Sequence, residues 1–141
     1  MSDQLAHEDL DASSQPGGPP ALRIANAVGR LHKELAGRGP TKVRTYIQED
    51  MVACVLEGGL TRAEQTVLEH AGTGPVVEMR LRLQAAMRPS IVEIVEGILG
   101  RSVRSFMSAN DPGSNLQVET LLLEPQIAGS SAPFDGDGAR D

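Results

Sequence analysis

Side chains able to carry nucleophilic or metal-dependent chemistry are few in this chain. Its three histidines, His7, His32 and His70, form no H-x-x-x-H or H-E-x-x-H pair, so the sequence does not support a metal site. We expect solvent-facing or helix-terminal positions for them. Cys54 lies in an apolar run with no neighbour that would lower its pKa, and it is predicted to be a buried, inert thiol. The sequence therefore predicts no catalytic residue, no metal ligand and no cofactor.

Basic residues follow a glycine–proline pair, and these could bind an anion. Lys42 and Arg44 come directly after Gly39–Pro40, and Arg80 lies further along the chain. The G-R-G-P segment is not a phosphate-binding loop, because it lacks the G-x-x-x-x-G-K-[ST] pattern and precedes a strand. One interpretation is a small-ligand or anion site built by these three cations. The other is a helix stop followed by a strand, with the cations on a solvated face or a docking surface.

Charge and composition divide the chain into a neutral centre and two acidic ends. The 141 residues carry 13 Lys and Arg against 19 Asp and Glu, and all of the net charge of -6 comes from residues 1–19 and 125–141. Both ends are rich in Gly, Ser and Pro and are predicted to be disordered. Residues 20–124 are predicted to form one domain. Its neutrality argues against nucleic-acid binding. No apolar run reaches the roughly 18 to 20 residues that would insert into a membrane.

The first half of this domain reads as a helix and a hairpin. Apolar residues recur at helical spacing from Pro20 until glycines and Pro40 end the helix. Residues 42–48 alternate in character and predict a strand with one face inward. Glu49–Asp50 then make a short connection into the β-branched run 51–58, a second strand.

The second half reads as two helices and another hairpin. Thr61 and Glu64 form a capping-box pattern at the start of a helix that ends near His70. A long apolar pattern from Val76 predicts a further helix that Gly100 closes. Pro89 lies inside this helix and predicts a kink or a short break. Residues 101–108 and 116–124, joined by a turn, complete the second hairpin.

This element order, α-β-β-α-α-β-β, predicts a two-layer α+β fold. Two hairpins make a four-stranded, mainly antiparallel sheet with helices on one face. Leu121, Leu122 and Leu123 are consecutive in the last strand, although a strand with one covered face should alternate. We expect a second subunit to cover the other face or the edge, which makes this run a candidate homodimer interface. The alternative is that a tail or the long helix covers it within one chain.

The order of these elements resembles the MpsC-like family, named after the C component of a sodium-translocating, membrane-potential-generating system. The resemblance covers about residues 22–124. It rests on turn, cap and helix-end motifs rather than on reactive groups. Those motifs fall on Gly39–Pro40, Leu60–Thr61–Glu64, Arg80 and Leu99–Gly100. It implies an accessory protein linked to a system for cation translocation or inorganic-carbon uptake.

Taken together, these observations favour a non-enzymatic accessory or regulatory protein. It would bind another protein, such as a membrane transport subunit, and would act as a cytoplasmic homodimer at the inner face of the membrane. A small-ligand or anion sensor is the second hypothesis, and it requires Lys42, Arg44 and Arg80 to converge. An enzyme of unrecognised type is the third, and it requires a buried carboxylate or histidine facing a cleft.

Overall fold

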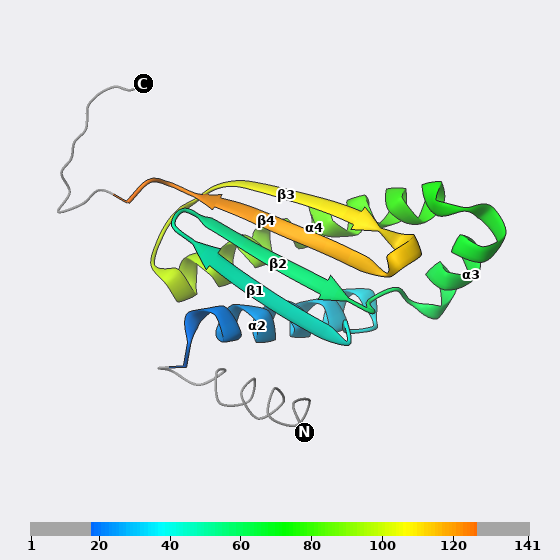
Figure 1. Ribbon diagram of the computed structural model, residues 1–141, viewed down its shortest axis with the longest axis horizontal. Helices are drawn as coiled ribbons and strands as arrows, with labels where there is room; N and C mark the ends of the chain where they lie inside the picture. Colours follow the sequence, from blue (N-terminus) through cyan, green and yellow to red (C-terminus); the bar gives the residue numbers. More distant parts are fainter. Residues whose placement is uncertain (1–17, 127–141) are drawn as a thin grey trace.

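The fold has two layers, a four-stranded sheet and helices against one of its faces (Figure 1). The computed structural model describes residues 18–126, so the predicted disordered tails lie almost entirely outside the described residues. The predicted element order is confirmed. The elements are α2 (Pro20–Ala36), β1 (Lys42–Gln48), β2 (Met51–Glu57), α3 (Arg62–Ala71), α4 (Thr73–Leu99), β3 (Val103–Asp111), the short 3-10 helix η1 (Pro112–Ser114) and β4 (Leu116–Leu123).

The sheet joins the two predicted hairpins through their second strands. Its order is β1-β2-β4-β3 and every neighbouring pair is antiparallel. The register places Thr45, Cys54, Glu119 and Ser108 in one row across all four strands. Because side chains alternate between the faces of a sheet, this row lies on a single face. α2 packs beside β1 and α4 beneath β3, so both helices cover that face.

An aliphatic core fills the space between the helices and the inner face of the sheet. Its members are almost fully buried, and burying each apolar side chain stabilises the fold by about 1.5–3 kcal/mol. They come from α2, both central strands and α4: Ile24, Val28, Val52, Leu56, Met87, Ile91, Val95, Leu121 and Leu123. The core therefore holds the two helices to the centre of the sheet.

The long helix α4 departs from the predicted pattern in three ways. It begins at Thr73, earlier than expected, because Pro75 lies in its first turn, where the missing N–H has no helical partner to lose. It runs through Pro89 without a break and ends at Gly100, whose positive φ of 66° closes it as predicted. Met79, which belongs to the apolar pattern that begins at Val76, is 57% exposed, whereas Arg80 is buried. The core-facing stripe of α4 is thus partly polar.

The last strand divides its leucines between the two faces of the sheet. Leu121 and Leu123 are buried in the core of one chain, and Leu122 is half-buried on the opposite, outer face. The run predicted as one dimer interface is therefore not one surface. The alternation of a strand in a helix-covered sheet accounts for this, because each single-residue step reverses the direction of the side chain.

Candidate functional site

Arg80 is the centre of a buried polar network between α4, α3 and the sheet. Its side chain is 2% exposed, and it donates four hydrogen bonds. Nε and Nη2 bond the two carboxylate oxygens of Glu64 at 2.9 and 2.6 Å, Nη2 also bonds the Gly59 carbonyl oxygen at 2.6 Å, and Nη1 bonds Gln117 Oε1 at 3.2 Å. A bidentate arginine–carboxylate pair of this kind fixes orientation as well as charge.

Glu64 has two tasks at the start of α3. Its carboxylate accepts the Thr61 backbone N–H at 2.8 Å, and the Thr61 hydroxyl accepts the Glu64 backbone N–H at 3.1 Å, which confirms the predicted capping box. Burial raises the pKa of Glu64, but hydrogen bonds from Arg80 and Thr61 and the positive charge of Arg80 outweigh it, so that its pKa lies below the ordinary value of 4.5. Glu64 therefore remains a carboxylate paired with Arg80.

The network continues along β4 to a buried histidine. Gln117 donates from Nε2 to Glu119 Oε2 at 2.8 Å, and His32 Nε2 lies 3.0 Å from the same oxygen. Glu119 is fully buried, and its other oxygen, Oε1, has no hydrogen-bond partner among the described residues. The expectation that His32 faces solvent or ends a helix is wrong, because its imidazole pairs with a carboxylate in the interior.

Cys54 lies beside this carboxylate in the row across the sheet. Burial raises the pKa of its thiol to about 12, a hydrogen bond with Thr45 opposes that rise, and the charge of Glu119 adds to it. The thiolate, which is the reactive form of cysteine, is thus disfavoured at neutral pH. This agrees with the predicted buried, inert thiol.

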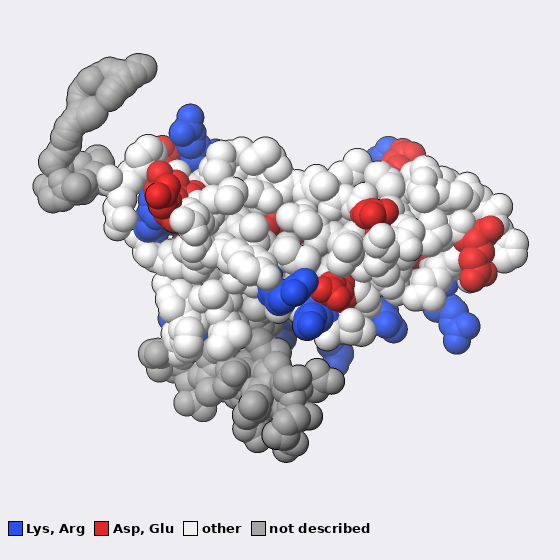
Figure 2. All heavy atoms as spheres, in the orientation of Figure 1, with Lys and Arg blue, Asp and Glu red and all other residues white. Residues whose placement is uncertain are grey.

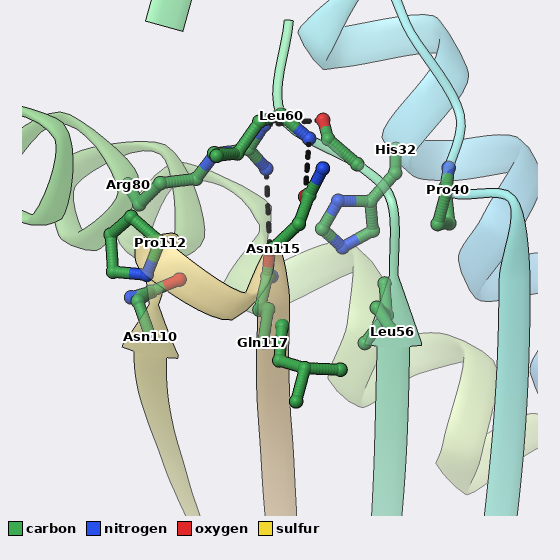
Figure 3. Close-up of a pocket in the computed structure, with 11 residues that line it drawn as sticks. His32, Pro40, Leu56, Leu60, Arg80, Asn110, Pro112, Asn115 and Gln117 are labelled. Carbon is green, nitrogen blue, oxygen red and sulfur yellow. Dashed lines mark hydrogen bonds between the residues drawn. The ribbon is translucent and has the colours of Figure 1, made fainter. Parts of the chain in front are cut away.

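A small pocket lies at the end of the sheet where the network meets the loops (Figure 3). Arg80 and Gln117 point toward each other on one side of it, and His32 and Pro40 lie on the other. The pocket has room for about one water molecule. Because the polar groups around it bond one another, the arrangement ties elements together. It offers a substrate no space.

The three cations proposed to bind an anion do not converge. Arg80 lines this pocket, but Lys42 and Arg44 lie on the outer face of β1, and Arg44 pairs with Glu57 at 2.7 Å. Of the motif residues, Pro40 and Leu60 line the pocket and Thr61 and Glu64 lie next to it. Gly39 packs against Lys33 of α2, and Gly100 lies at the far end of α4.

The outer face of the sheet is the second candidate surface. None of the helices within residues 18–126 covers it, and Figure 2 shows it as a largely uncharged area with acidic and basic groups toward its margins. Its apolar side chains come from all four strands. They include Tyr46, Met51, Val55, Met107, Leu116, Val118 and Leu122. Tyr46 and Met107 are 53% and 48% exposed and lie in one row of the register.

The chain matches the model of a known family. The family model described as "Na+-translocating membrane potential-generating system (MpsC)" matches residues 21–125, which is most of the chain and nearly all of the described fold. The chain belongs to the MpsC family. It has no significant similarity to a curated protein or to a solved structure.

In this MpsC protein, two of the motifs that suggested the family, Leu60–Thr61–Glu64 and Arg80, lie at the buried network. Leu60, Thr61, Glu64 and Arg80 are spread over twenty residues, yet they meet at one end of the sheet. No helix in the described part of the chain is long and apolar enough to cross a bilayer. The described residues also hold no group of three or more His, Cys, Asp or Glu side chains suited to a metal ion.

Sequence reasoning missed the residues of β4 that complete the network. Gln117 and Glu119 are at odd-numbered positions of β4, as Leu121 and Leu123 are. Because side chains alternate between the faces of a sheet, all four point inward. A carboxylate at an inward strand position requires a buried partner. That signal was present in the sequence, and it predicts a buried donor without identifying His32.

Proposed function

We propose that this MpsC protein is a non-enzymatic accessory subunit that binds another protein, a component of a Na+-translocating membrane potential-generating system. It would act as a homodimer in the cytoplasm, at the inner face of the membrane. The observation that carries the proposal is the outer face of the sheet, which no helix within residues 18–126 covers and where apolar side chains from four strands form one surface.

The chemistry of this face suits a protein partner. Contiguous exposed apolar surface on a folded domain marks an interaction site, and aromatic and methionine side chains are enriched in such sites. Tyr46, Met51 and Met107 supply those side chains. Lys42, Arg44 and Asp111 lie at one margin of the face and provide a charged rim. An apolar centre with a charged rim is the usual anatomy of a protein interface.

The buried network supports a structural role for the groups that might otherwise be catalytic. His32 and Glu119 resemble a histidine oriented by a carboxylate, an arrangement that catalysis uses when a nucleophile or substrate lies at the other ring nitrogen. Here the adjoining pocket accommodates about one water molecule. The network therefore favours a scaffold that presents a surface.

The proposal is tested by affinity capture of the tagged protein from its own cells after the membranes are solubilised. We expect the parent chain to recover a membrane transport subunit. Met107→Glu places a charge on the outer face, and we expect this variant not to recover the subunit. Met79→Glu is the matched control, since Met79 is also about half exposed but lies on α4, on the other side of the sheet. Equal capture by both variants would contradict the proposal, as would recovery of soluble partners alone.

A further inference from the structure

Within residues 18–126, no strand pairs with the outer edge of β1, which we call the free edge. The strand order places it at one margin of the sheet, with β2 as its hydrogen-bonded neighbour. At the ends of β2, Gly58 N–H bonds the Asn115 carbonyl oxygen at 2.9 Å and Leu123 N–H bonds the Asp50 carbonyl oxygen at 2.8 Å. Even-numbered positions of β2 therefore face β4, and odd-numbered positions face β1. In an antiparallel ladder with this register, Val43, Thr45 and Ile47 direct their backbone N–H and C=O groups to the free edge.

The two margins of the sheet differ in their protection. β3, at the other margin, has a register shift between Val103 and Ser105 and is followed by Pro112, and both features hinder addition of a further strand. β1 pairs with β2 in continuous register over all seven residues, from Lys42 to Gln48. Its edge is thus a regular template for another strand.

A groove runs beside this edge, between β1 and the first half of α2. It is open to solvent, has a volume of about 220 Å³ and is lined by Ala21, Leu22 and Ala25 of α2 and by residues 43–46 of β1. The two alanines leave space where larger side chains would fill it. The groove can therefore accept inward-facing side chains of a strand that continues the sheet. Ile47, on the inner face of β1, remains 38% exposed without such a strand.

The sequence of β1 is complementary to itself in one antiparallel register. When the two-fold axis passes through Thr45, the middle residue, all seven positions pair. Val43 then faces Ile47 of the second copy, Arg44 faces Tyr46, and Lys42 faces Gln48. An axis through Arg44 would oppose two arginines, and like charges directly opposite each other destabilise a sheet. The register centred on Thr45 avoids this and stacks a cation against an aromatic ring.

We propose that a second copy of this chain docks on this edge, with the two β1 strands antiparallel about Thr45, and forms a continuous eight-stranded sheet. This inference deepens the proposed homodimer and rests on it. The outer faces of both sheets remain free for the partner protein. Thr45 and Ile47 of the second copy lie over the groove beside α2. This contact pairs the β1 edge of one copy with the β1 edge of the other, so that neither edge remains open to further strands.

The backbone contact is tested by the mass of the full chain in solution, measured by light scattering and sedimentation over a concentration series. Thr45→Pro removes an N–H that points to the free edge and keeps the β1–β2 ladder. Ser108→Pro makes the same change at the other margin, in the same row of the sheet. We expect the parent and Ser108→Pro to be dimers of about 30 kDa, twice the 14.9 kDa chain, and Thr45→Pro to be a folded monomer.

The register is tested by two charges at one exposed position. Tyr46→Lys places a cation opposite Arg44 of the second copy, and Tyr46→Glu places an anion there. We expect the dimer of Tyr46→Glu to dissociate with a Kd about tenfold lower than that of Tyr46→Lys, and the difference to shrink at high salt. Contact through the outer faces predicts instead that both charges weaken the dimer alike, and that result would overturn the inference.

The remaining outcomes separate this inference from the proposed function. A parent chain that remains a monomer at all concentrations overturns the edge contact and the homodimer together, and it leaves binding to another protein to its own test. A dimer that survives Thr45→Pro but dissociates with Leu122→Glu retains the homodimer and overturns the edge contact. A folded Thr45→Pro monomer that still captures the transport subunit supports both proposals.

Discussion

At the scale of single residues, the Arg80 side chain joins three parts of the structure. One guanidinium contacts the start of α3 through Glu64, the loop before it through Gly59, and β4 through Gln117. A buried charge is tolerated only when its partners replace the lost water, and here four hydrogen bonds do so. The partners depend on Arg80 in the same way.

Replacing Arg80 by methionine should therefore destabilise the fold strongly. The change leaves Glu64 and Gln117 without their donor in a largely buried place, and we expect the free energy of unfolding to fall by about 3 kcal/mol. Arg82→Met is the control, because Arg82 makes an exposed pair with Glu78 on the same helix and should cost less than about 0.5 kcal/mol. Urea denaturation measures both. Similar losses in the two variants would show that the network contributes little.

Because the pKa of Glu64 is lowered in the folded protein, the free energy of unfolding depends on pH in the acidic range. A carboxyl group whose pKa is lower in the folded state stabilises the protein at pH values above its pKa in the unfolded state, here 4.5. That contribution is lost as the pH falls through the pKa of the folded state. We expect unfolding free energies measured between pH 6 and pH 3 to fall toward acid. Glu64→Gln should flatten this fall, and Glu78→Gln, at an exposed pair, should not. Parallel curves for the two variants would contradict the assignment.

Cys54 should be unreactive while the protein is folded. With the pKa of its thiol at about 12, hardly any thiolate exists at pH 8, and the side chain is fully buried. We expect no reaction with a chromogenic disulfide reagent in buffer and complete reaction in guanidinium chloride. Rapid labelling of the native protein would show that the β1–β2 hairpin opens easily.

The sequence allowed the turn and cap residues to be predicted better than the buried polar ones. The capping box at Thr61 depends on residues three apart, so it is visible locally. His32 and Glu119 are 87 residues apart, and the sequence alone does not show that they meet. Arg80 was expected on a solvated or ligand-binding surface for the same reason. The isolated residue gave no sign of Glu64 and Gln117 as partners.

At the scale of elements, local signals account for most of the boundaries. β1, β2 and the start of α3 fall where alternation, a two-residue connection and the capping box predict them. α4 is the exception, since it continues through Pro89. Its burial against β3 and α2 offsets the local cost of one proline. Tertiary packing outweighed the local rule at that position.

The cap at α3 can be tested by Thr61→Ala. This change removes the oxygen that accepts the Glu64 N–H, and we expect a loss of about 1 kcal/mol in the free energy of unfolding. Thr66→Ala is a useful comparison, because Thr66 lies inside the same exposed helix and its hydroxyl bonds only the Arg62 carbonyl oxygen. Equal stability of Thr61→Ala and the parent would show that the cap is dispensable.

At the scale of the whole molecule, the two faces of the sheet should respond differently to charge. Leu123→Glu buries a carboxylate in the core, and we expect it to unfold the chain as followed by circular dichroism. Leu122→Glu places the same charge on the outer face. This variant should remain folded but should no longer bind the partner protein. Unfolding by both changes would place Leu122 in a core that the described residues do not show.

The middle of the sheet also determines how the chain can fold. Within each hairpin the paired strands are close in sequence, as with Tyr46 and Ala53, whereas β2 and β4 pair across some sixty residues, as with Leu56 and Gln117. Closing a loop of that length costs entropy before any contact between the strands forms. The two hairpins can therefore form early and independently. We expect the joining of the hairpins to set the folding rate. Truncating the Leu121 side chain at this junction should therefore slow refolding, while changes at the β1 edge should mainly speed unfolding.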